Sequence, residues 1–316
     1  MAAILEIQNL TKKYGEKTAV DEVCFSIEQG EIFSLLGPNG AGKTSILLML
    51  SGVTRPTRGD ARIAGHSVVR EPRLAKSQIG VVPQEIALYE ALSARDNLFF
   101  WGRMYDMDGP ALRQRVDEVL EIIGLSDRAG DRVETFSGGM KRRVNIGAGL
   151  LHQPQILFMD EPTVGIDPQS RRNILDSVKA LNRAGLTVLY TTHYMEEAQE
   201  LSDRVGILDH GRLIALGTQA ELTQLVGQHE TVRLRLEDGQ PVETVSADLS
   251  ALPAVVEASP AGDEVVVMVP DASSALPPIL MRTAALNIRV RSVEIQEPNL
   301  EAVFLRLTGR ALRDEG

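Results

Sequence analysis

The most informative motif of this chain is Gly37-Pro38-Asn39-Gly40-Ala41-Gly42-Lys43-Thr44. It matches the pattern G-x-x-x-x-G-K-[ST] and lies between two apolar segments, residues 31–36 and 45–50. The pattern predicts a strand, a glycine-rich loop and a helix, with backbone N–H groups and the helix dipole directed at a polyphosphate. A flexible glycine turn is the alternative, but the flanking segments argue against it. We expect the phosphates of a nucleotide to bind these eight residues and the following Ser45.

A second motif supplies the carboxylates that this chemistry needs. Residues 156–159 are apolar, and Asp160 and Glu161 follow them. In a buried strand, both carboxylates would emerge at the carboxyl end, where open α/β sheets bind ligands. We expect Asp160 and the Thr44 hydroxyl to hold Mg²⁺, Lys43 to bridge the β and γ phosphates, and Glu161 to polarise the attacking water. Taken alone, the motif also fits an acidic strand end that faces solvent.

The first two-thirds of the chain alternates strand-like and helix-like segments. Predicted strands cover residues 4–10, 20–27, 31–36, 155–160 and 187–192, and predicted helices cover 45–50, 111–123 and 171–183. This alternation predicts an α/β fold with a parallel sheet covered on both faces.

The sequence changes character near residue 227, after which no lysine occurs. The patterns there predict strands at 231–236, 264–269 and 287–295, a helix at 272–286 that Pro277–Pro278 should break or restart, and a last helix at 298–307. Pro298 near the start of that helix and Gly309 after its end fit common helix boundaries. We expect two domains, residues 1–227 and a small α+β domain, residues 228–316.

Composition excludes several classes of protein. Lys and Arg number 33 against 43 Asp and Glu, a net charge of −10, which argues against nucleic acid as a partner. Cys24 is the only cysteine, so an intramolecular disulfide is impossible, and its neighbours Val23 and Phe25 predict that it is buried. No apolar run reaches 18 residues and no secretory signal is present, so we expect a cytoplasmic protein whose membrane span, if it needs one, lies on another chain.

The family resemblance rests first on Phe136-Ser137-Gly138-Gly139-Met140. This run resembles the Leu-Ser-Gly-Gly-Gln signature of ABC ATPases, the nucleotide-binding subunits of ABC transporters, and departs from it at Phe136 and Met140. The resemblance implies a P-loop NTPase of ABC type, with a parallel sheet core, an antiparallel β-subdomain and a helical subdomain at about residues 85–152. It also implies that Ser137, Gly138 and Gly139 contact phosphate. A simpler role for Ser137, as the N-cap of a helix, fits the run equally well.

Further family elements follow in the expected order. Tyr14 matches the aromatic that stacks on adenine, and Gln84 matches the glutamine that reaches Mg²⁺ and the attacking water. Asp167, in Gly165-Ile166-Asp167, matches the D-loop, and His193 matches the switch histidine on the γ phosphate. In the family, two copies pair head to tail, and each ATP lies between the P-loop of one copy and the signature of the other. The resemblance therefore implies a dimer that ATP holds closed.

The resemblance also implies a partner in the membrane. In this family, a groove on the helical subdomain binds the membrane subunit. Five of the thirteen aromatic residues of this chain lie in the segment after Gln84, namely Tyr89, Phe99, Phe100, Trp101 and Tyr105. These rings also suit the subdomain core. The chain would then be peripheral on the inner face of the cell membrane.

Three further stretches resemble the drug-exporter branch of the daunorubicin-resistance type. They are Lys141-Arg142-Arg143, the run from Thr191 to Ala198, and the tail from Pro298 to Leu305 with Thr308-Gly309-Arg310. They imply export of a drug, a lipid or a polysaccharide-like compound. A non-transport ABC ATPase of DNA repair or translation is the main alternative, and a module that binds ATP without hydrolysing it is a second. The C-terminal domain is expected to serve dimer contact or regulation, or to be a passive appendage.

Overall fold

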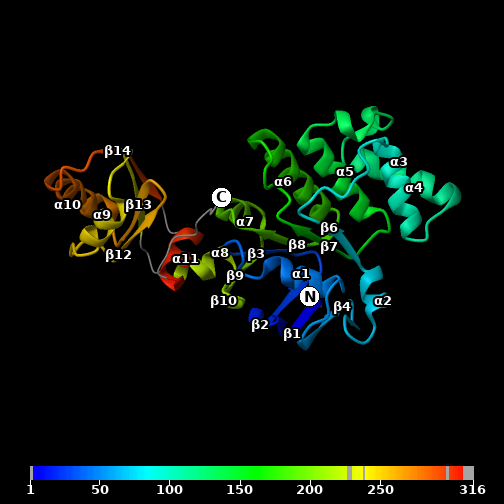
Figure 1. Ribbon diagram of the computed structural model, residues 1–316, viewed down its shortest axis with the longest axis horizontal. Helices are drawn as coiled ribbons and strands as arrows, with labels where there is room; N and C mark the ends of the chain where they lie inside the picture. The colour runs from blue at the N-terminus through cyan, green and yellow to red at the C-terminus, as the bar shows by residue number, and fades with distance from the viewer. Residues whose placement is uncertain (1–2, 226–229, 238, 297–298, 309–316) are drawn as a thin grey trace.

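A six-stranded sheet forms the centre of the computed structural model, which describes residues 3–225, 230–237, 239–296 and 299–308 (Figure 1). The strand order is β10-β9-β3-β8-β7-β6, and all neighbours are parallel except β10, which is antiparallel to β9. The strands are β3 (Ile32–Leu36), β6 (Ile79–Val82), β7 (Ile156–Asp160), β8 (Thr187–Thr192), β9 (Arg204–Asp209) and β10 (Arg212–Gly217). The predicted α/β class is thus confirmed.

An antiparallel sheet, β2-β1-β4-β5, covers one face of the central sheet. It consists of β1 (Ala3–Tyr14), β2 (Lys17–Glu28), β4 (Arg58–Ile63) and β5 (His66–Ser67), accompanied by α1 (Lys43–Leu50) and α2 (Pro72–Ser77). Side chains of β7 alternate between the faces: Ile156 and Phe158 pack toward this sheet, and Leu157 and Met159 toward the opposite helices. A strand buried on both faces explains the continuous apolar run before Asp160.

Helices cover the other face. They are α3 (Ala94–Met104), α4 (Gly109–Ile122), α5 (Gly138–Leu150) and α6 (Pro168–Arg183), with 3₁₀ turns at Ser126–Arg128 and Val133–Thr135. α3, α4 and α5 contact one another and share one core with the sheet. α7 (Met195–Leu201) follows β8, and α8 (Gln219–Gln224) follows β10.

The C-terminal part contains a third sheet, in the order β12-β13-β11-β14. Its strands are β11 (Glu230–Leu236), β12 (Glu257–Ala261), β13 (Glu264–Val269) and β14 (Val290–Gln296), and α9 (Val242–Leu249) and α10 (Ala272–Ala285) cover one face. The last helix, α11 (Leu300–Thr308), contacts α7 and α8 and lies between them and this sheet (Figure 1). The sequence did not predict α9 or β12.

Three expectations about local structure are corrected. α10 runs unbroken through Pro277–Pro278, because the carbonyls that lose N–H donors belong to the exposed residues Ser273 and Ser274, which water can reach. β14 begins at Val290 rather than 287, since Asn287 has a φ of 55° and ends the α10 turn.

The third correction concerns Cys24, which is exposed. Val23 and Phe25 face the core, so the alternation of β2 turns the intervening side chain to the opposite face. The expected helix boundaries at Pro298 and Gly309 lie outside the described residues. Within the described part of the chain, every helix is too short or too polar to cross a membrane.

Candidate nucleotide-binding site

The glycine-rich loop joins β3 to α1 and approaches neighbouring backbone too closely for larger residues. Gly42, the N-cap of α1, has a φ of 111°, and a Cβ there would lie 2.5 Å from the Ala19 carbonyl oxygen. A Cβ on Gly37 would lie 2.2 Å from the Leu208 carbonyl oxygen. The loop therefore needs glycine at these positions, which leaves its N–H groups and the start of α1 facing the adjacent pocket.

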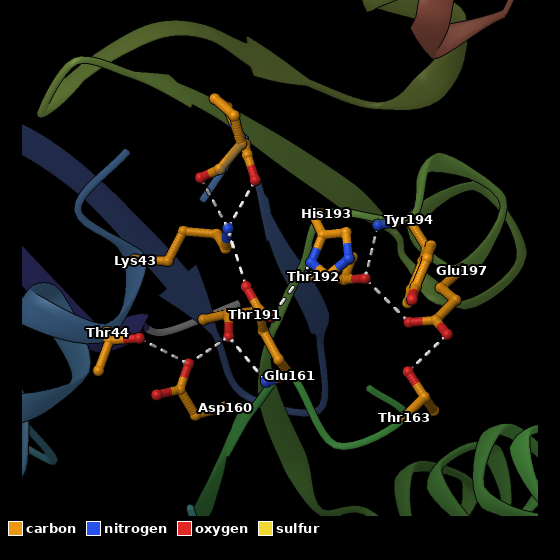
Figure 2. Close-up of polar contacts among 12 residues, drawn as sticks. Lys43, Thr44, Asp160, Glu161, Thr163, Thr191, Thr192, His193, Tyr194 and Glu197 are labelled. Carbon is orange, nitrogen blue, oxygen red and sulfur yellow. Dashed lines mark hydrogen bonds and ion pairs between the residues drawn. The ribbon is translucent and has the colours of Figure 1, made fainter. Parts of the chain in front are cut away.

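Lys43 extends from the first turn of α1 into this pocket. Its Nζ donates to the carbonyl oxygens of Gly37 and Pro38, at 2.6 and 3.0 Å, and lies 3.0 Å from Glu161 Oε1 (Figure 2). Burial lowers the pKa of Lys43, although the Glu161 carboxylate opposes that shift. The ammonium group is thus held beside the loop, where it can contact phosphate oxygens.

Asp160 and Thr44 lie side by side below the loop. Thr44 Oγ1 donates to Asp160 Oδ1 at 3.3 Å, and Thr191 Oγ1 donates to the same oxygen at 2.7 Å (Figure 2). Burial raises the pKa of Asp160, and the two hydroxyl hydrogen bonds oppose the shift. A hydroxyl and a carboxylate, both hard oxygen donors, are the ligands that Mg²⁺ uses in such sites.

Glu161 is held in an unusual backbone conformation at the end of β7. Its φ is 42°, in the left-handed region, and its N–H lies 3.2 Å from the Thr191 carbonyl oxygen and 3.1 Å from Thr191 Oγ1. Its Oε2 lies 3.1 Å from His193 Nδ1, which donates if the carboxylate is ionised. Burial raises the pKa of Glu161, but the hydrogen bond from His193 and the charge of Lys43 outweigh burial and lower it.

A cavity of about 520 Å³ joins these groups. Ten of the predicted site residues line it: Tyr14, Asn39, Gly40, Gly42, Lys43, Thr44, Ser45, Gln84, Glu161 and His193. Gly37, Pro38, Ala41 and Asp160 do not line it, but Gly37 and Pro38 accept hydrogen bonds from Lys43 and Asp160 accepts one from Thr44. Lys17, Ala19 and Val164 also line it and were not predicted. Lys17 pairs with Tyr14 across the β1–β2 hairpin. The hairpin pattern in the sequence could therefore have indicated that Lys17 lies beside Tyr14 at the site.

The loop that carries Gln84 is held by α5. Arg142, buried one turn into α5, donates to the carbonyl oxygens of Pro83 and Gln84, each at 2.6 Å. Asn145 Oδ1, one turn further, accepts from the Ala87 N–H at 3.3 Å. Neither residue was predicted as a site component, because only the tertiary structure places α5 against this loop.

The signature residues lie apart from this cavity. Ser137 is the N-cap of α5 and accepts from the Met140 N–H at 3.3 Å, as the simpler interpretation expected. Ser137 and Gly138 are exposed, and a Cβ on Gly138 would lie 3.4 Å from Ile166. The structure thus places the signature beside the D-loop, where exposed Asp167 caps α6 through the Ser170 N–H. Neither segment lines the cavity of Lys43.

The residues present fit ATP and Mg²⁺. The loop offers a cradle that only glycine permits, and Thr44 and Asp160 offer two oxygen ligands. Among the described residues no group of three or more His, Cys, Asp or Glu side chains could hold a metal ion. Mg²⁺ takes few protein ligands and completes its shell with phosphate oxygens and water, so Thr44 and Asp160 would be enough protein ligands for it.

The fold and this cavity define a P-loop ATPase, and comparisons with known proteins give its family. The ABC transporter family profile matches residues 20–164. The chain is 46% identical over 320 residues to the linearmycin resistance ATP-binding protein of Bacillus subtilis (strain 168), covering 98% of this chain and 100% of that one. It is 40% identical over 312 residues to the doxorubicin resistance ATP-binding protein of Mycobacterium tuberculosis (strain ATCC 25618 / H37Rv), covering 98% and 94%.

A solved structure shows the same fold. It is the dimeric post-hydrolysis state of an ATP-binding cassette bound to ADP and Pi, with a TM-score of 0.60 and 28% identity, covering 68% of this chain and 98% of that one. The chain belongs to the ABC transporter family and is the ATP-binding, ATP-hydrolysing subunit of such a transporter. The predicted fold class, family and drug-resistance branch are confirmed, and the transporter is favoured over a DNA repair or translation factor.

Proposed function

We propose that this subunit powers export of a drug, lipid or polysaccharide-like compound through a separate membrane subunit, by closing and reopening a head-to-tail dimer. One observation carries the dimer: Lys43, Glu161 and His193 converge on one cavity, whereas Ser137 and Gly138 are exposed outside it. Exposed helix-terminal N–H groups suit an anion brought by another molecule. The similar cassette whose solved structure is dimeric supports a dimer for this subunit.

We propose a division of labour within each ATP site. Lys43 holds phosphate oxygens, Tyr14 stacks on the adenine, and Thr44, Asp160 and Gln84 hold Mg²⁺, which when bound neutralises phosphate charge. Glu161 orients the attacking water as general base, and its lowered pKa keeps it ionised for that role. Ser137, Gly138, Gly139 and Asp167 complete the site of the second copy.

The closed dimer is tested with Glu161→Gln. The variant keeps the shape of the site but loses the base, so we expect ATP binding without turnover and an ATP-dependent dimer in gel filtration. Lys43→Ala, which removes the phosphate contact, is the control and should stay monomeric with ATP. If Glu161→Gln binds ATP and remains a monomer, the dimer proposal is wrong.

Mixing two inactive variants tests whether the site is shared. Lys43→Ala damages the P-loop half and Ser137→Arg the signature half. A mixed head-to-tail dimer would contain one intact site and one site with both defects, so mixing should restore phosphate release that neither variant shows alone. No recovery on mixing, with both variants folded, would argue that each chain hydrolyses ATP by itself.

For the membrane partner we propose a small groove beside the Gln84 loop. A cavity of about 200 Å³ lies there, and its lining consists of Val81, Pro83, Ala87, Trp101, Tyr105, Asn145, Ala148 and Gly149. Phe99 and Trp101 pack on the helical core, and we propose that Trp101 and Tyr105 also contact the membrane subunit through this groove. Two relatives are named as linearmycin resistance and doxorubicin resistance ATP-binding proteins, and these names support export as the direction of transport. Co-purification with a polytopic membrane protein from cell membranes tests this partner and the expected peripheral position at the inner membrane face.

We retain residues 1–227 and 228–316 as the proposed domains, with the helical subdomain at about 85–152. The second domain is proposed to regulate the first rather than to be a passive appendage. Support comes from α11, whose Val303 and Phe304 share a core with Met195 of α7, two residues after His193.

A further inference from the structure

Glu197 is a buried carboxylate outside the nucleotide cavity. It lies on α7, four residues after His193, and is only 2% exposed. Three hydroxyl groups donate to it. Tyr190 donates at 2.9 Å. Thr163 donates at 2.6 Å and Thr192 at 2.9 Å, as Figure 2 shows. Arg171 Nε lies 3.6 Å away. A carboxylate is costly to bury, so a site that satisfies it this fully holds its surroundings in one arrangement.

The three hydroxyls belong to segments that carry the proposed catalytic groups. Thr192 directly precedes His193, and its Oγ1 also accepts from the Tyr194 N–H at 2.9 Å. The backbone is therefore tied to Glu197 on both sides of His193. Thr163 lies two residues after Glu161, in the turn that follows β7. One carboxylate thus joins the segment of His193 to the segment of Glu161.

The charge of Glu197 fixes the direction of these hydrogen bonds. An ionised carboxylate only accepts, so every hydroxyl around it must donate. Burial raises the pKa of Tyr190 well above its ordinary value, and Glu197 adds to the shift, so that hydroxyl keeps its proton. An amide at position 197 would present N–H donors to groups that are already donating. Thr192 Oγ1 has little room to adapt, since it already accepts from Tyr194.

We propose that Glu197 is a positioning residue for ATP hydrolysis, which aligns the His193 ring with the Glu161 carboxylate by anchoring Thr192 and Thr163. The inference rests on the proposed roles of His193 and Glu161. Glu197 does not line the nucleotide cavity, so it acts on alignment and not on ATP affinity. It lines a separate cleft with Arg171 and Tyr194, where the Arg171 guanidinium lies 4.4 Å from the Tyr194 ring centroid.

Steady-state ATPase kinetics of the 316-residue chain test the proposal. We expect Glu197→Gln to lower kcat by about ten- to a hundredfold, the effect of a small misplacement of reacting groups. The KM for ATP should stay within about twofold, because the P-loop contacts are intact. Glu196→Gln, the same change at the exposed neighbouring position, should match the parent. Thr192→Val removes one hydroxyl at nearly constant side-chain volume and should likewise lower kcat with little change in KM. This second variant keeps the test valid if Glu197→Gln does not fold.

A double-mutant cycle with His193→Ala shows whether Glu197 acts through the histidine. Single-turnover phosphate release measures the slow variants. We expect Glu197→Gln to have little further effect in the His193→Ala background. An equal loss in both backgrounds, or an unchanged kcat in Glu197→Gln and Thr192→Val, would overturn the proposal and leave the role of His193 intact. Parental turnover in His193→Ala itself would instead refute the proposed role of the histidine, and the positioning role would fall with it.

Discussion

Glu161 shows how single residues set this site. Its left-handed backbone is disfavoured for a non-glycine residue by about 1–2 kcal/mol. Two hydrogen bonds from its N–H to Thr191 and the contacts of its carboxylate with Lys43 and His193 offset that cost. Strain held in place by surrounding contacts is common where a side chain must point in one direction. Here the strain turns the carboxylate back toward the phosphate-binding loop.

Gly42 offers a direct test at the same scale. Gly42→Ala would force a Cβ to within 2.5 Å of the Ala19 carbonyl oxygen at a φ of 111°. We expect the loop to shift, destabilising the protein by about 1–3 kcal/mol and weakening ATP binding by at least about tenfold. Calorimetric ATP binding and thermal unfolding measure the two effects. Gly130→Ala, where the new Cβ meets no atom within 4 Å, is the control. Equal ATP affinity in both variants would contradict this account of the loop.

Helix α11 shows how one element joins two parts of the chain. Five of its nine residues are buried, namely Leu300, Ala302, Val303, Phe304 and Leu305. They share a core with Leu36, which precedes the phosphate-binding loop, and with Met195 of α7. The last described helix therefore belongs to the packing of the ATPase core, although it lies far along the chain from both.

Two alanine substitutions on α11 distinguish the loss of a buried side chain from a general effect on the helix. Phe304 is 1% exposed, so Phe304→Ala should cost about 3–5 kcal/mol through lost burial and a residual cavity. Leu307, 40% exposed on the same helix, should cost less than about 1 kcal/mol when changed to Ala. Thermal and denaturant unfolding provide the measurement. Similar losses in the two variants would show that α11 does not pack as described.

At the scale of the whole molecule, an ion cluster ties α11 to the C-terminal sheet. Arg233 of β11 lies 2.8 Å from Glu301 of α11 and 2.9 Å from Glu264 of β13. Burial raises the pKa of Glu301, Arg233 opposes the shift, and Glu196, Glu264 and Glu294 add to it. Glu196 lies on α7, so the pKa of Glu301 depends on a charge of the ATPase core as well as on charges of the C-terminal sheet.

The raised pKa of Glu301 predicts a pH dependence of stability. The folded state holds this proton more tightly than the unfolded state, so the contribution is full below the ordinary pKa of 4.5 and is lost as pH rises through the folded value. Glu301→Gln cannot lose a proton, so its free energy of unfolding should improve relative to the parent as pH rises above 4.5. Denaturant unfolding across this range measures the difference. A difference between Glu301→Gln and the parent that stays constant across this range would contradict the prediction.

The α/β fold and the family could be read from the sequence, which also predicted the glycine-rich loop and the Asp160–Glu161 pair as a nucleotide site. These features depend on local patterns, because glycine spacing, apolar runs and adjacent carboxylates are all contiguous along the chain. The resemblance then identified Gln84 and His193 by their order. Tertiary structure alone revealed Arg142 behind the Gln84 loop, Glu197 among three hydroxyls and α11 beside α7, since each depends on side chains that lie far apart in sequence. The predictions that Cys24 is buried and that Pro277–Pro278 breaks the helix were wrong for a related reason. Strand alternation decides which face Cys24 lies on, and the exposure of the neighbouring carbonyl groups allows the helix to continue through the two prolines.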